Sequence, residues 1–537
     1  MRGGSGPFVR VTTAAESADA DRAAIAAGTP GRALMQRAGA AAAGEIVRRY
    51  AHLLGSGVAV HCGPGNNGGD GWVVAAALRR FGVRVGAVPR GGDAPHTDDA
   101  RFEFDRAWAA GACGPVTGSE RLVVDAVLGT GARPPARDHA LAYARHLAEE
   151  GVRVATGEGA SGRVVVALDV PSGLDATTGD EIGLAVRADL TLTFGTLKRG
   201  LLVRRDLAGT IAVLDIGLGE AEAAVGEAPV LYDPATTLGA SAGSIPAGAH
   251  KGTRGKVAVV GGAPGMAGAA ILACDAALRS GAGMVRAVVA PESLPAVQGV
   301  LPAAMAAAWP TDGGALASSI VDWADAVVLG PGLGASPAAA ALVDRVLAAW
   351  RGPTVLDADA LNHFAGRPEA LAAALGARPA LLTPHPLEFA RLAAVSPEAV
   401  LAGRFDVGRA FAGRIGAAVL LKGVPTVVSD ARGATVVASG TPALATAGSG
   451  DVLSGIAAAL MVGPGEPDGA AVGAAAAWVH GRAGELATAR RGGVRGTTLG
   501  DVVDALQDAW PRPDAADRLT SARAPYPVLA ELPAVPG

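Results

Sequence analysis

Short hydrophobic runs alternate with helix-like stretches through most of the chain. Residues 13–50 and 70–81 carry apolar side chains at helical spacing. In the first part of the chain, the predicted strands lie at 58–60, 83–88, 122–127, 164–170, 190–194 and 211–214. Strands that alternate with helices form mainly parallel sheets covered by helices on both faces, so the pattern predicts an α/β, three-layer αβα fold.

A second series of strands follows a stretch without clear periodicity. Residues 223–245 are rich in Ala, Gly, Ser and Pro, and we interpret them as a linker. Further strands are predicted at 256–261, 285–290, 326–329, 354–356, 380–383, 418–421 and 426–429. The chain is therefore predicted to form two three-layer αβα domains, at 1–222 and 246–510. The proline-rich residues 511–537 are expected to be a loose tail.

The composition of the 537-residue chain argues against several classes of function. Half of the residues are hydrophobic, and the net charge of -4 gives no basic surface for nucleic acid. No apolar run approaches the roughly 18 to 20 residues that span a bilayer, and the first residues lack the apolar core of a secretory signal. Cys62, Cys113 and Cys274 lack the spacing of a disulfide framework or a zinc site. We therefore expect a cytoplasmic enzyme of small molecules that binds neither nucleic acid nor membrane.

Lysine is rare in this chain, because arginine supplies nearly all of the 46 basic side chains. Only four lysines occur, each beside a glycine-rich segment: Lys198, Lys251, Lys256 and Lys422. An ammonium is more compact than a guanidinium, so these positions are candidates for sites that need a compact cation. An alternative of equal weight is that these lysines are ordinary surface residues that occur at these positions by chance.

Two glycine-rich loops end in Gly-Asp, one in each predicted domain. They are GPGNNGGDG at 63–71 and AGSGD at 447–451. Glycine lets backbone N–H groups approach an anion, and a following helix adds the positive end of its dipole. The loops predict two ligand sites, the alternative being glycine turns that bind nothing.

Carboxylates follow two strands of the first predicted domain. Asp125 precedes a second glycine loop, and Asp169 is followed by a Pro-Ser-Gly turn. Because the carboxyl ends of parallel strands meet at one crevice, these side chains are candidates for a metal ligand and a general base. The side-chain oxygens of Asn66 and Asn67 also suit a hard cation. The competing interpretation is that each aspartate caps a helix or shapes a turn.

Residues 10–220 resemble the NAD(P)H-hydrate epimerase family, also called YjeF N-terminal domains, through the motifs GPGNNGGDG, DAVLGTG and DVPSGLDATTG. The resemblance implies that Asp169 is the acid/base at the hydrated nicotinamide ring. It also implies that Asn67, Asp125 and Ser172 hold a potassium ion. The implied contacts with the hydrated dinucleotide are Asn66, Asn67, Gly68, Gly69, Asp70, Gly129, Thr130, Gly131, Ala132, Arg133, Pro134, Pro135 and Asp169.

The second predicted domain carries its own motifs. They are HKG at 250–252, GGAPGMAGA at 261–269, GPGLG at 330–334, LDADALN at 356–362, TPHPLEF at 383–389, LKG at 421–423 and GSGD at 448–451. Backbone donors at a helix N-terminus stabilise a phosphoryl group in transfer, and Asp451 is placed to accept the proton of an attacking hydroxyl. The alternatives are an N-cap for Asp451 and a rigid turn for His385.

This series is similar to the ADP-dependent NAD(P)H-hydrate dehydratase family, which has the ribokinase-like fold, over residues 240–510. The resemblance implies that ADP, with magnesium, phosphorylates the hydroxyl of the hydrated ring, with Asp451 as the base. Phosphate then leaves, and the products are the reduced cofactor, AMP and phosphate. The implied substrate contacts are Ala269, Gly334, His385 and Asp451, and the implied adenine-nucleotide contacts are Lys422, Gly423, Val424, Pro425, Thr426 and Gly450.

Together the two resemblances imply a bifunctional nicotinamide-nucleotide repair enzyme, an isomerase and a lyase. An epimerase that interconverts the R and S hydrates of NADH and NADPH would feed a dehydratase that accepts the S form. One alternative is a ribokinase-like kinase of a small alcohol with a non-catalytic nucleotide-binding first domain; another is an assembly protein whose first domain is a scaffold. The residues do not distinguish ADP from ATP. Relatives of both domains commonly self-associate, which predicts a homo-oligomer.

Overall fold

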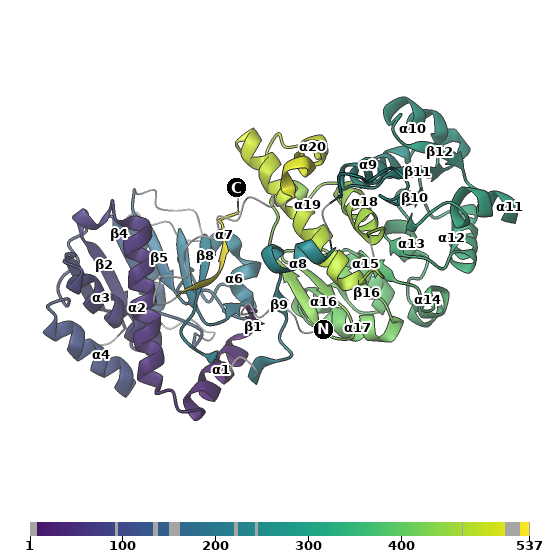
Figure 1. Cartoon of the computed structure of the whole chain (residues 1–537). Coiled ribbons are helices and arrows are strands. Elements are labelled where there is room, and N and C mark those ends of the chain that lie inside the picture. The colour runs from purple at the N-terminus through teal and green to yellow at the C-terminus, as the bar shows by residue number, and fades with distance from the viewer. Residues whose placement is uncertain are drawn as a thin grey trace. The chain divides into compact units, whose positions relative to one another are not determined.

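The computed structural model describes residues 8–91, 95–132, 138–149, 162–219, 224–241, 245–463, 466–510 and 527–535. These residues fall into two compact units. The first domain contains the described residues up to Ala228 together with 527–535, and the second domain contains those from Pro229 to 510 (Figure 1). Each domain is built around its own large sheet.

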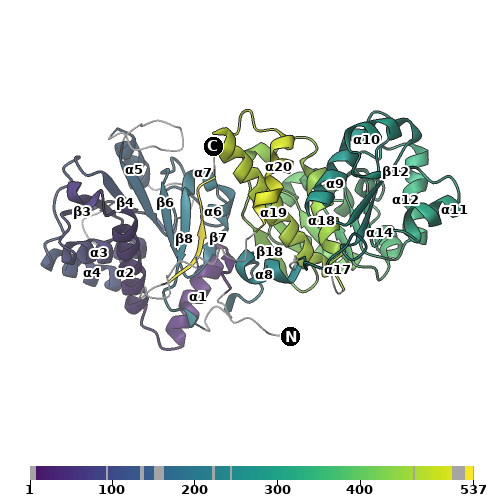
Figure 2. The same cartoon turned by 45° about the horizontal axis from the view of Figure 1, so that its top comes forward.

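A seven-stranded sheet forms the centre of the first domain, in the order β19-β8-β6-β5-β4-β2-β3. Its strands are β2 (Val58–Cys62), β3 (Val85–Pro89), β4 (Leu122–Ala126), β5 (Val164–Leu168), β6 (Leu190–Phe194), β8 (Thr210–Leu214) and β19 (Val528–Leu532). All run parallel except β19, which pairs antiparallel with β8 at one edge (Figure 2). A separate parallel pair joins β1 (Val11–Thr12) to β7 (Leu197–Lys198). The carboxyl ends of β2, β4 and β5 therefore share one edge of the sheet.

Helices cover both faces of this sheet. They are α1 (Ala14–Ala26), α2 (Gly31–Tyr50), α3 (Asn66–Arg80), α4 (Asp98–Ala109), α5 (Asp138–Glu149), α6 (Arg199–Val203) and α7 (Arg205–Ala208). Val60 and Val124 belong to the core beneath α2 and α3, whereas Ala59 and Val123 pack in a separate cluster with Tyr143 of α5. Successive strand residues point to opposite, equally buried faces, which explains why the strands are almost uninterrupted apolar runs.

The second domain contains a ten-stranded sheet in the order β12-β11-β10-β13-β14-β15-β16-β17-β18-β9. Its strands are β9 (Val230–Leu231), β10 (Lys256–Val260), β11 (Met284–Val289), β12 (Met305–Ala308), β13 (Ala326–Leu329), β14 (Thr354–Leu356), β15 (Ala380–Leu382), β16 (Ala418–Leu421), β17 (Thr426–Ser429) and β18 (Ala434–Val437). The strands from β12 to β16 are parallel, and β17 runs antiparallel to both of its neighbours. This sheet is therefore mainly parallel, as predicted.

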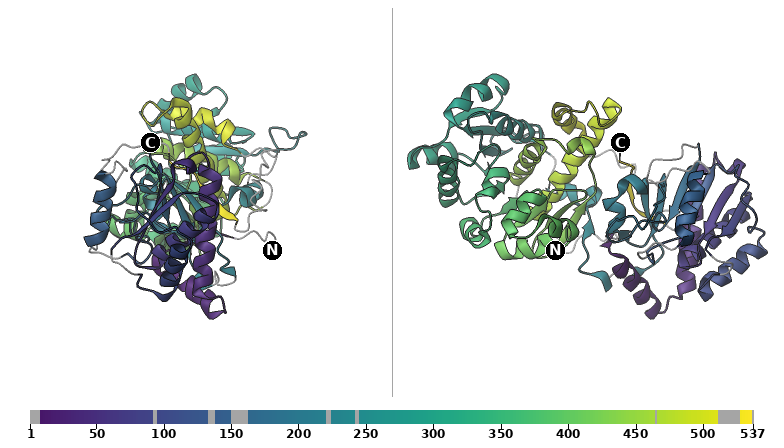
Figure 3. Two further views of the ribbon diagram at one scale, coloured as in Figure 1. Left: turned by 90° about the vertical axis from the view of Figure 1, so that its left-hand side faces the viewer. Right: turned by 180° about the vertical axis from the view of Figure 1, so that it is seen from behind.

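Helices complete the second domain. They are α8 (Pro234–Ser241), α9 (Ala267–Arg279), α10 (Leu294–Val300), α11 (Gly313–Leu316), α12 (Pro337–Ala349), α13 (Ala358–Asn362), α14 (Pro368–Leu375), α15 (Pro386–Ala393), α16 (Pro397–Ala402), α17 (Val407–Ile415), α18 (Ser449–Met461), α19 (Gly469–Arg491) and α20 (Leu499–Ala509). The last two pack side by side (Figures 1 and 3). None of the helices described is long and apolar enough to cross a membrane. The predicted α/β class, with two three-layer αβα domains, is confirmed.

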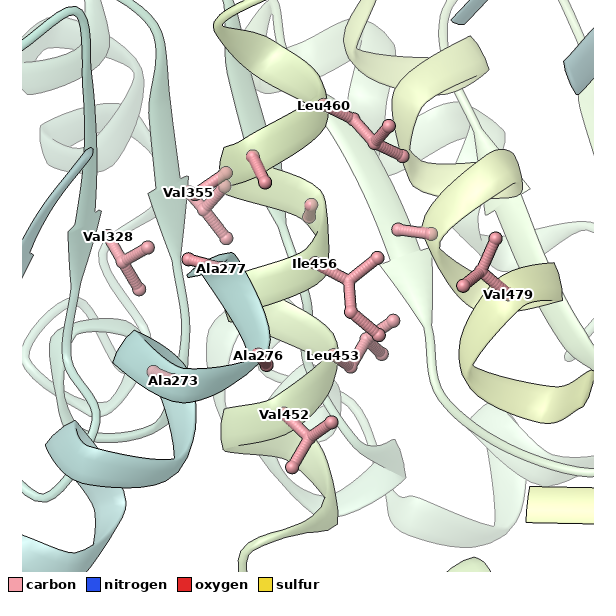
Figure 4. Packing of buried hydrophobic residues seen from close by; sticks show 14 of the residues in the cluster. Ala273, Ala276, Ala277, Val328, Val355, Val452, Leu453, Ile456, Leu460 and Val479 are labelled. Carbon is pink, nitrogen blue, oxygen red and sulfur yellow. The ribbon is translucent and has the colours of Figure 1, made fainter. Parts of the chain in front are cut away.

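Helix α18 is held rigidly by close packing against α9. Ala273 and Ala276 of α9 belong to the same buried core as Leu453 and Ile456 of α18, whose side chains point toward Val479 of α19 (Figure 4). A Cβ added at Gly455 would lie only 2.2 Å from the carbonyl oxygen of Ala273, so glycine is required for this approach. The packing fixes the position of the first turn of α18, which carries the predicted catalytic carboxylate.

Both Gly-Asp segments lie within the start of a helix rather than in a loop before it: Asp451 is in the first turn of α18, and Asp70 comes just after the first turn of α3. Helix α3 begins at Asn66, earlier than predicted, and α18 begins at Ser449. The N-caps are Gly65 and Gly448, and no side chain caps either helix. The N-cap interpretation of Asp451 is therefore wrong. The N–H groups of both first turns, which a helix leaves without intrahelical partners, point toward any ligand bound there.

The prediction that residues 223–245 are a linker and that residues 511–537 are a loose tail is wrong in part, because both segments contain a strand. Strand β9 pairs with β18, and α8 packs against α19, so both belong to the second domain. Strand β19 completes the sheet of the first domain. These short segments owe their structure to partners far away in the sequence, which composition does not reveal. Within these two segments, residues 223, 242–244, 511–526 and 536–537 lie outside the described part of the chain.

Candidate functional site

Asp169 follows β5 directly, in a left-handed backbone conformation (φ 64°) that is uncommon for a residue with a side chain. Its N–H donates to the carbonyl of Leu192 at 2.8 Å. Its Oδ1 lies 2.7 Å from Lys198 Nζ, and its Oδ2 accepts the Thr130 N–H at 3.2 Å. The carboxylate is therefore anchored on both sides, with Oδ2 toward the glycine loop after β4.

A cavity of about 550 Å³ adjoins this carboxylate. Its wall combines apolar side chains, among them Met35 and Phe194, with a few polar groups. The predicted site residues that line it are Asn66, Asn67, Asp70, Gly129, Thr130, Gly131, Ala132 and Asp169. The volume and the mixed lining are typical of a small-molecule site.

Three further carboxyl groups line the same cavity: Asp21 from α1, Asp70 from α3 and Asp99 from α4. Burial raises the pKa of Asp70 well above its usual range, and the charges of Asp169 and Asp21 add to the shift. Burial also raises the pKa of Asp21, with Lys198 acting in the opposite direction. Perturbed carboxyl groups that converge on a cavity are typical of sites that transfer protons.

The side chains of Asn67, Asp125 and Ser172 meet around Leu128. Ser172 Oγ donates to Asp125 Oδ1 at 2.6 Å and accepts the Leu128 N–H at 2.8 Å, while Asn67 Nδ2 donates to the Leu128 carbonyl at 2.9 Å. Asn67 Oδ1 is buried, and no hydrogen-bond partner for it lies in the described residues. A buried oxygen rarely lacks a partner, so this set fits a cation with oxygen ligands.

Asp125 gives a second reason to expect a cation here. Its side chain is fully buried, and burial raises its pKa, although hydrogen bonds from Ser172 oppose the shift. No lysine or arginine within the described ranges forms an ion pair with it. Nor do three or more His, Cys, Asp and Glu side chains cluster to hold a metal anywhere in those ranges. The amide, hydroxyl and carboxylate oxygens of these three side chains carry at most one negative charge together. Such a set of ligands suits a monovalent ion.

A second group of charges lies beside the first turn of α18. Lys422 Nζ is 3.0 Å from Asp357 Oδ1 and 3.9 Å from Glu388 Oε2. A Cβ added at Gly450 would lie 3.0 Å from the same nitrogen. Burial opposes the charge, but Asp357 and Glu388 raise the pKa of Lys422, so the ammonium is retained. An ammonium next to the N–H groups of a helix N-terminus is suited to phosphate.

Asp451, in the same first turn, has an unusual acidity. Burial raises its pKa to about 7, Asp357 adds to the shift, and Lys422 opposes it. A carboxylate that titrates near neutral pH is a stronger base than an ordinary surface carboxylate. The arrangement therefore combines a phosphate cradle with a base.

His385 is the N-cap of α15. Its Nδ1 accepts the N–H groups of Leu387 (3.1 Å) and Glu388 (3.3 Å), and Glu388 Oε2 accepts the His385 N–H at 2.8 Å. Because Nδ1 accepts, the ring proton is assigned to Nε2, which lies 3.4 Å from Glu388 Oε1. Burial and Lys422 lower the pKa of His385, which keeps the ring neutral. His385 is thus a helix cap, its ring borders the charges around Lys422, and its contact with a substrate stays a prediction.

Ala269, in the first turn of α9, and Gly334, in the loop after β13, lie near the same charges. A Cβ added at Gly332 would lie 2.9 Å from the Ala269 Cβ. The Gly334 N–H donates to Asp359 Oδ2 at 2.7 Å, and the charge of Asp359 acts on Asp451. The predicted substrate contacts of the second domain therefore surround one region at the carboxyl ends of its strands.

Comparison with known proteins matches each half of the chain. The sequence pattern of the YjeF-related protein N-terminus matches residues 31–200, and that of NAD(P)H-hydrate dehydratase matches residues 257–508. The chain is 39% identical to the bifunctional NAD(P)H-hydrate repair enzyme Nnr of Salinibacter ruber, over 88% of this chain and 91% of that protein. The chain belongs to the bifunctional NAD(P)H-hydrate repair enzyme family.

Other relatives give the same result. The bifunctional NAD(P)H-hydrate repair enzyme Nnr of Escherichia coli is 35% identical, over 88% of this chain and 88% of that protein. A solved structure of an ADP/ATP-dependent NAD(P)H-hydrate dehydratase from Bacillus subtilis, co-crystallized with ATP/Mg²⁺, is 28% identical. It covers 50% of this chain and 92% of its own, with a TM-score of 0.43. The two family patterns and the repair-enzyme relatives confirm both family resemblances found in the sequence.

Two of the predicted contacts in this repair-enzyme chain lie away from the cavity wall. A Cβ added at Gly68 would lie 1.8 Å from the carbonyl oxygen of Gly63, and one added at Gly69 would lie 2.6 Å from the Met35 side chain. The structure thus gives both glycines a packing role in α3, and their contact with a ligand stays a prediction. The predicted contacts at Arg133, Pro134 and Pro135 lie outside the described residues.

Five predicted nucleotide contacts lie where β16 meets β17: Lys422, Gly423, Val424 and Pro425 form the turn, and Thr426 is the first residue of β17. Lys422 and Gly450 adjoin each other, as described above. The turn then leads outward, with Val424 63% exposed. Thr426 Oγ closes it by donating to the carbonyl of Gly423 at 3.3 Å.

The predicted contacts left out several charged residues of the two sites, among them Asp21, Lys198, Asp357 and Glu388. The rarity of lysine was the available signal for Lys198, because two of the four lysines, Lys198 and Lys422, are ion-paired at the two sites. Asp357 and Glu388 lie within motifs that we singled out. Sequence alone did not show that both converge on one ammonium, since Asp357 lies 65 positions from Lys422.

Proposed function

We propose that the first domain epimerises the hydrated nicotinamide ring of NADHX and NADPHX, and that the second dehydrates the S form at the expense of ADP. The products are NADH or NADPH, AMP and phosphate. One observation carries the proposal. In each domain of this chain from the repair-enzyme family, a carboxylate, Asp169 or Asp451, lies near a lysine ammonium at the carboxyl ends of the strands.

In the first step, inversion of the hydroxyl-bearing ring carbon requires a bond to that carbon to break and re-form. A proton must then be taken from, or delivered to, the hydroxyl or the ring nitrogen. Asp169 Oδ2 is the oxygen placed to do so, because Oδ1 is bound to Lys198. Apolar side chains of the cavity, such as Met35 and Phe194, suit the flat face of the ring.

In the second step, Asp451 takes the proton of the ring hydroxyl, whose oxygen attacks the terminal phosphorus of ADP. The bond to AMP breaks, and phosphate then leaves the ring while an adjacent ring proton is lost. Lys422 and the first-turn N–H groups of α18 stabilise the charge of the phosphoryl group during transfer. Magnesium bound with ADP would neutralise further phosphate charge.

A mixture of R and S hydrates of NADH, incubated with the protein, ADP and magnesium, tests this function. We expect the absorbance of reduced nicotinamide to return fully, with one AMP formed for each hydrate consumed. The competing function, a ribokinase-like kinase of a small alcohol, predicts a stable phosphorylated alcohol and no return of absorbance. No recovery with either ADP or ATP would end the repair interpretation.

Potassium binding by Asn67, Asp125 and Ser172 predicts a selective stabilisation of the first domain. At a potassium concentration about a hundred times its Kd, the free energy of unfolding should rise by about 2.7 kcal/mol, which corresponds to about 5 to 10 °C in Tm. Differential scanning calorimetry in potassium, sodium and lithium chloride at equal ionic strength measures it. The Asp125→Asn variant should lose the potassium response. An equal response to all three ions would contradict a selective site.

The acidity of Asp451 predicts the pH dependence of dehydration. Because the base must be ionised and its pKa is about 7, kcat/KM for the S hydrate should fall about tenfold per pH unit below neutral pH and level off above it. Initial rates with saturating ADP measure this, after subtraction of the reaction without enzyme at each pH. A flat profile down to about pH 5 would show that Asp451 is not the titrating base.

A further inference from the structure

Lys198 is the most deeply buried charged side chain of the first domain's cavity. It is 1% exposed, and its Nζ lies 2.7 Å from Asp169 Oδ1. The same nitrogen donates to the main-chain carbonyls of Phe194 (2.9 Å) and Thr196 (3.2 Å). The ammonium therefore has three fixed acceptors, two of which belong to rigid backbone at the end of β6.

The contacts of Asp169 divide its two oxygens between different environments. Oδ1 pairs with Lys198 Nζ and also accepts a hydrogen bond from the Thr193 hydroxyl at 3.3 Å. Within the described ranges, Oδ2 accepts one hydrogen bond, from the Thr130 N–H at 3.2 Å, and a Cβ added at Gly129 would lie 3.3 Å from it. Glycine at that position leaves space in front of Oδ2. One oxygen is thus anchored, and the other is presented to the cavity.

A purely structural role explains this arrangement poorly. A buried ion pair contributes little net stability compared with apolar side chains of similar volume. The chain otherwise uses arginine for almost all of its basic residues, yet here it has lysine. Lys198 also lines the cavity itself, so its ammonium borders the space that a ligand would occupy.

We propose that Lys198 is the positioning residue of the epimerase site, which fixes Oδ1 of Asp169 so that Oδ2 meets the reacting hydroxyl of the hydrate. This proposal rests on the proposed epimerase function. Lys198 acts through Asp169, and its hydrogen bonds leave none of its three protons for the substrate: one goes to the carboxylate and two go to backbone carbonyls. Loss of the ammonium should therefore reduce turnover rather than substrate affinity.

The test uses the full chain in an Asp451→Asn background, in which the second domain cannot consume the S hydrate. Purified R hydrate is supplied, and chromatography follows its conversion to S. Lys198→Ala should lower kcat about a hundredfold, because displacement of a catalytic group by about 1 Å reduces the reaction rate by about that factor. KM should change less than about threefold. Arg187→Ala, which removes an exposed basic residue of the same domain, is the matched control and should have no effect.

Chemical rescue separates positioning from packing. Lys198→Ala opens space next to the cavity, so n-propylammonium should restore a substantial part of kcat, whereas n-propanol, which has the same shape without the charge, should not. Equal rescue by the alcohol, or an unchanged kcat, would overturn the proposal. If Lys198→Ala and Lys198→Met both fail to fold by circular dichroism, the role is structural and the proposal is also overturned. If the parent with Lys198 intact fails to epimerise, the proposed function itself fails.

Discussion

Replacing Asp451 with asparagine is expected to abolish ADP-dependent recovery of the reduced cofactor. The change keeps the size of the side chain but removes the base, so kcat should fall by about 10²- to 10⁴-fold. The neighbouring Asp357 is poorly placed to substitute, because its Oδ1 binds Lys422 and accepts the N–H of Ala358. The initial rate of absorbance recovery with pure S hydrate, ADP and magnesium measures the effect.

Binding and folding controls distinguish loss of chemistry from loss of structure. Asp451→Asn should still bind ADP, since Lys422 and the N–H groups of α18 remain, and isothermal titration calorimetry measures this. Asp322→Asn, at an exposed aspartate of the same domain, is the matched variant and should retain full activity. A rate for Asp451→Asn within tenfold of the native protein would show that another group serves as the base.

Replacing Asp169 with asparagine is expected to leave one hydrate form unused. Asparagine cannot accept the proton that a carboxylate oxygen accepts, so epimerisation should slow by about 10²- to 10⁴-fold. With a mixture of hydrates, ADP and magnesium, the S form should be consumed at the native rate. The R form should then decline only at the spontaneous rate, which gives a biphasic recovery curve.

Each of the two variants serves as the experimental control for the other. Mixed in solution, Asp169→Asn and Asp451→Asn chains should together recover the whole mixture, because each supplies the step that the other lacks. Asp169→Asn should also keep the potassium-dependent rise in Tm, since it leaves Asn67, Asp125 and Ser172 intact. If Asp169→Asn slows consumption of both hydrates equally, the division of labour between the domains is wrong.

Most of the fold could be predicted because its strands are buried on both faces. Apolar runs such as those at 122–126 and 326–329 are easily recognised, since parallel strands of this kind have no polar side. Strand β9 has two residues, and β19 follows a proline-rich stretch, so neither has a strong local pattern. Each is a strand because a distant edge strand offers unpaired hydrogen-bonding groups, and sequence patterns do not record such pairings.

The candidate sites could be predicted in part, for a similar reason. Asp169 and Asp451 stand in distinctive local motifs, and the structure places each beside an ammonium. The partners of those carboxylates were missed because the contacts between Lys198 and Asp169, and between Lys422 and Asp357, join separate strand ends. The start of α3 at Asn66 was also missed, since four glycines among residues 65–71 read as a loop.

The central claim is that one chain performs two consecutive steps, and pure R hydrate of NADH tests it most directly. Without ADP, the protein should convert R hydrate to a mixture of R and S and form no reduced cofactor. After ADP and magnesium are added, the whole mixture should become NADH, with one AMP for each hydrate. R hydrate that stays unchanged without ADP, or NADH that forms without AMP, would contradict the account.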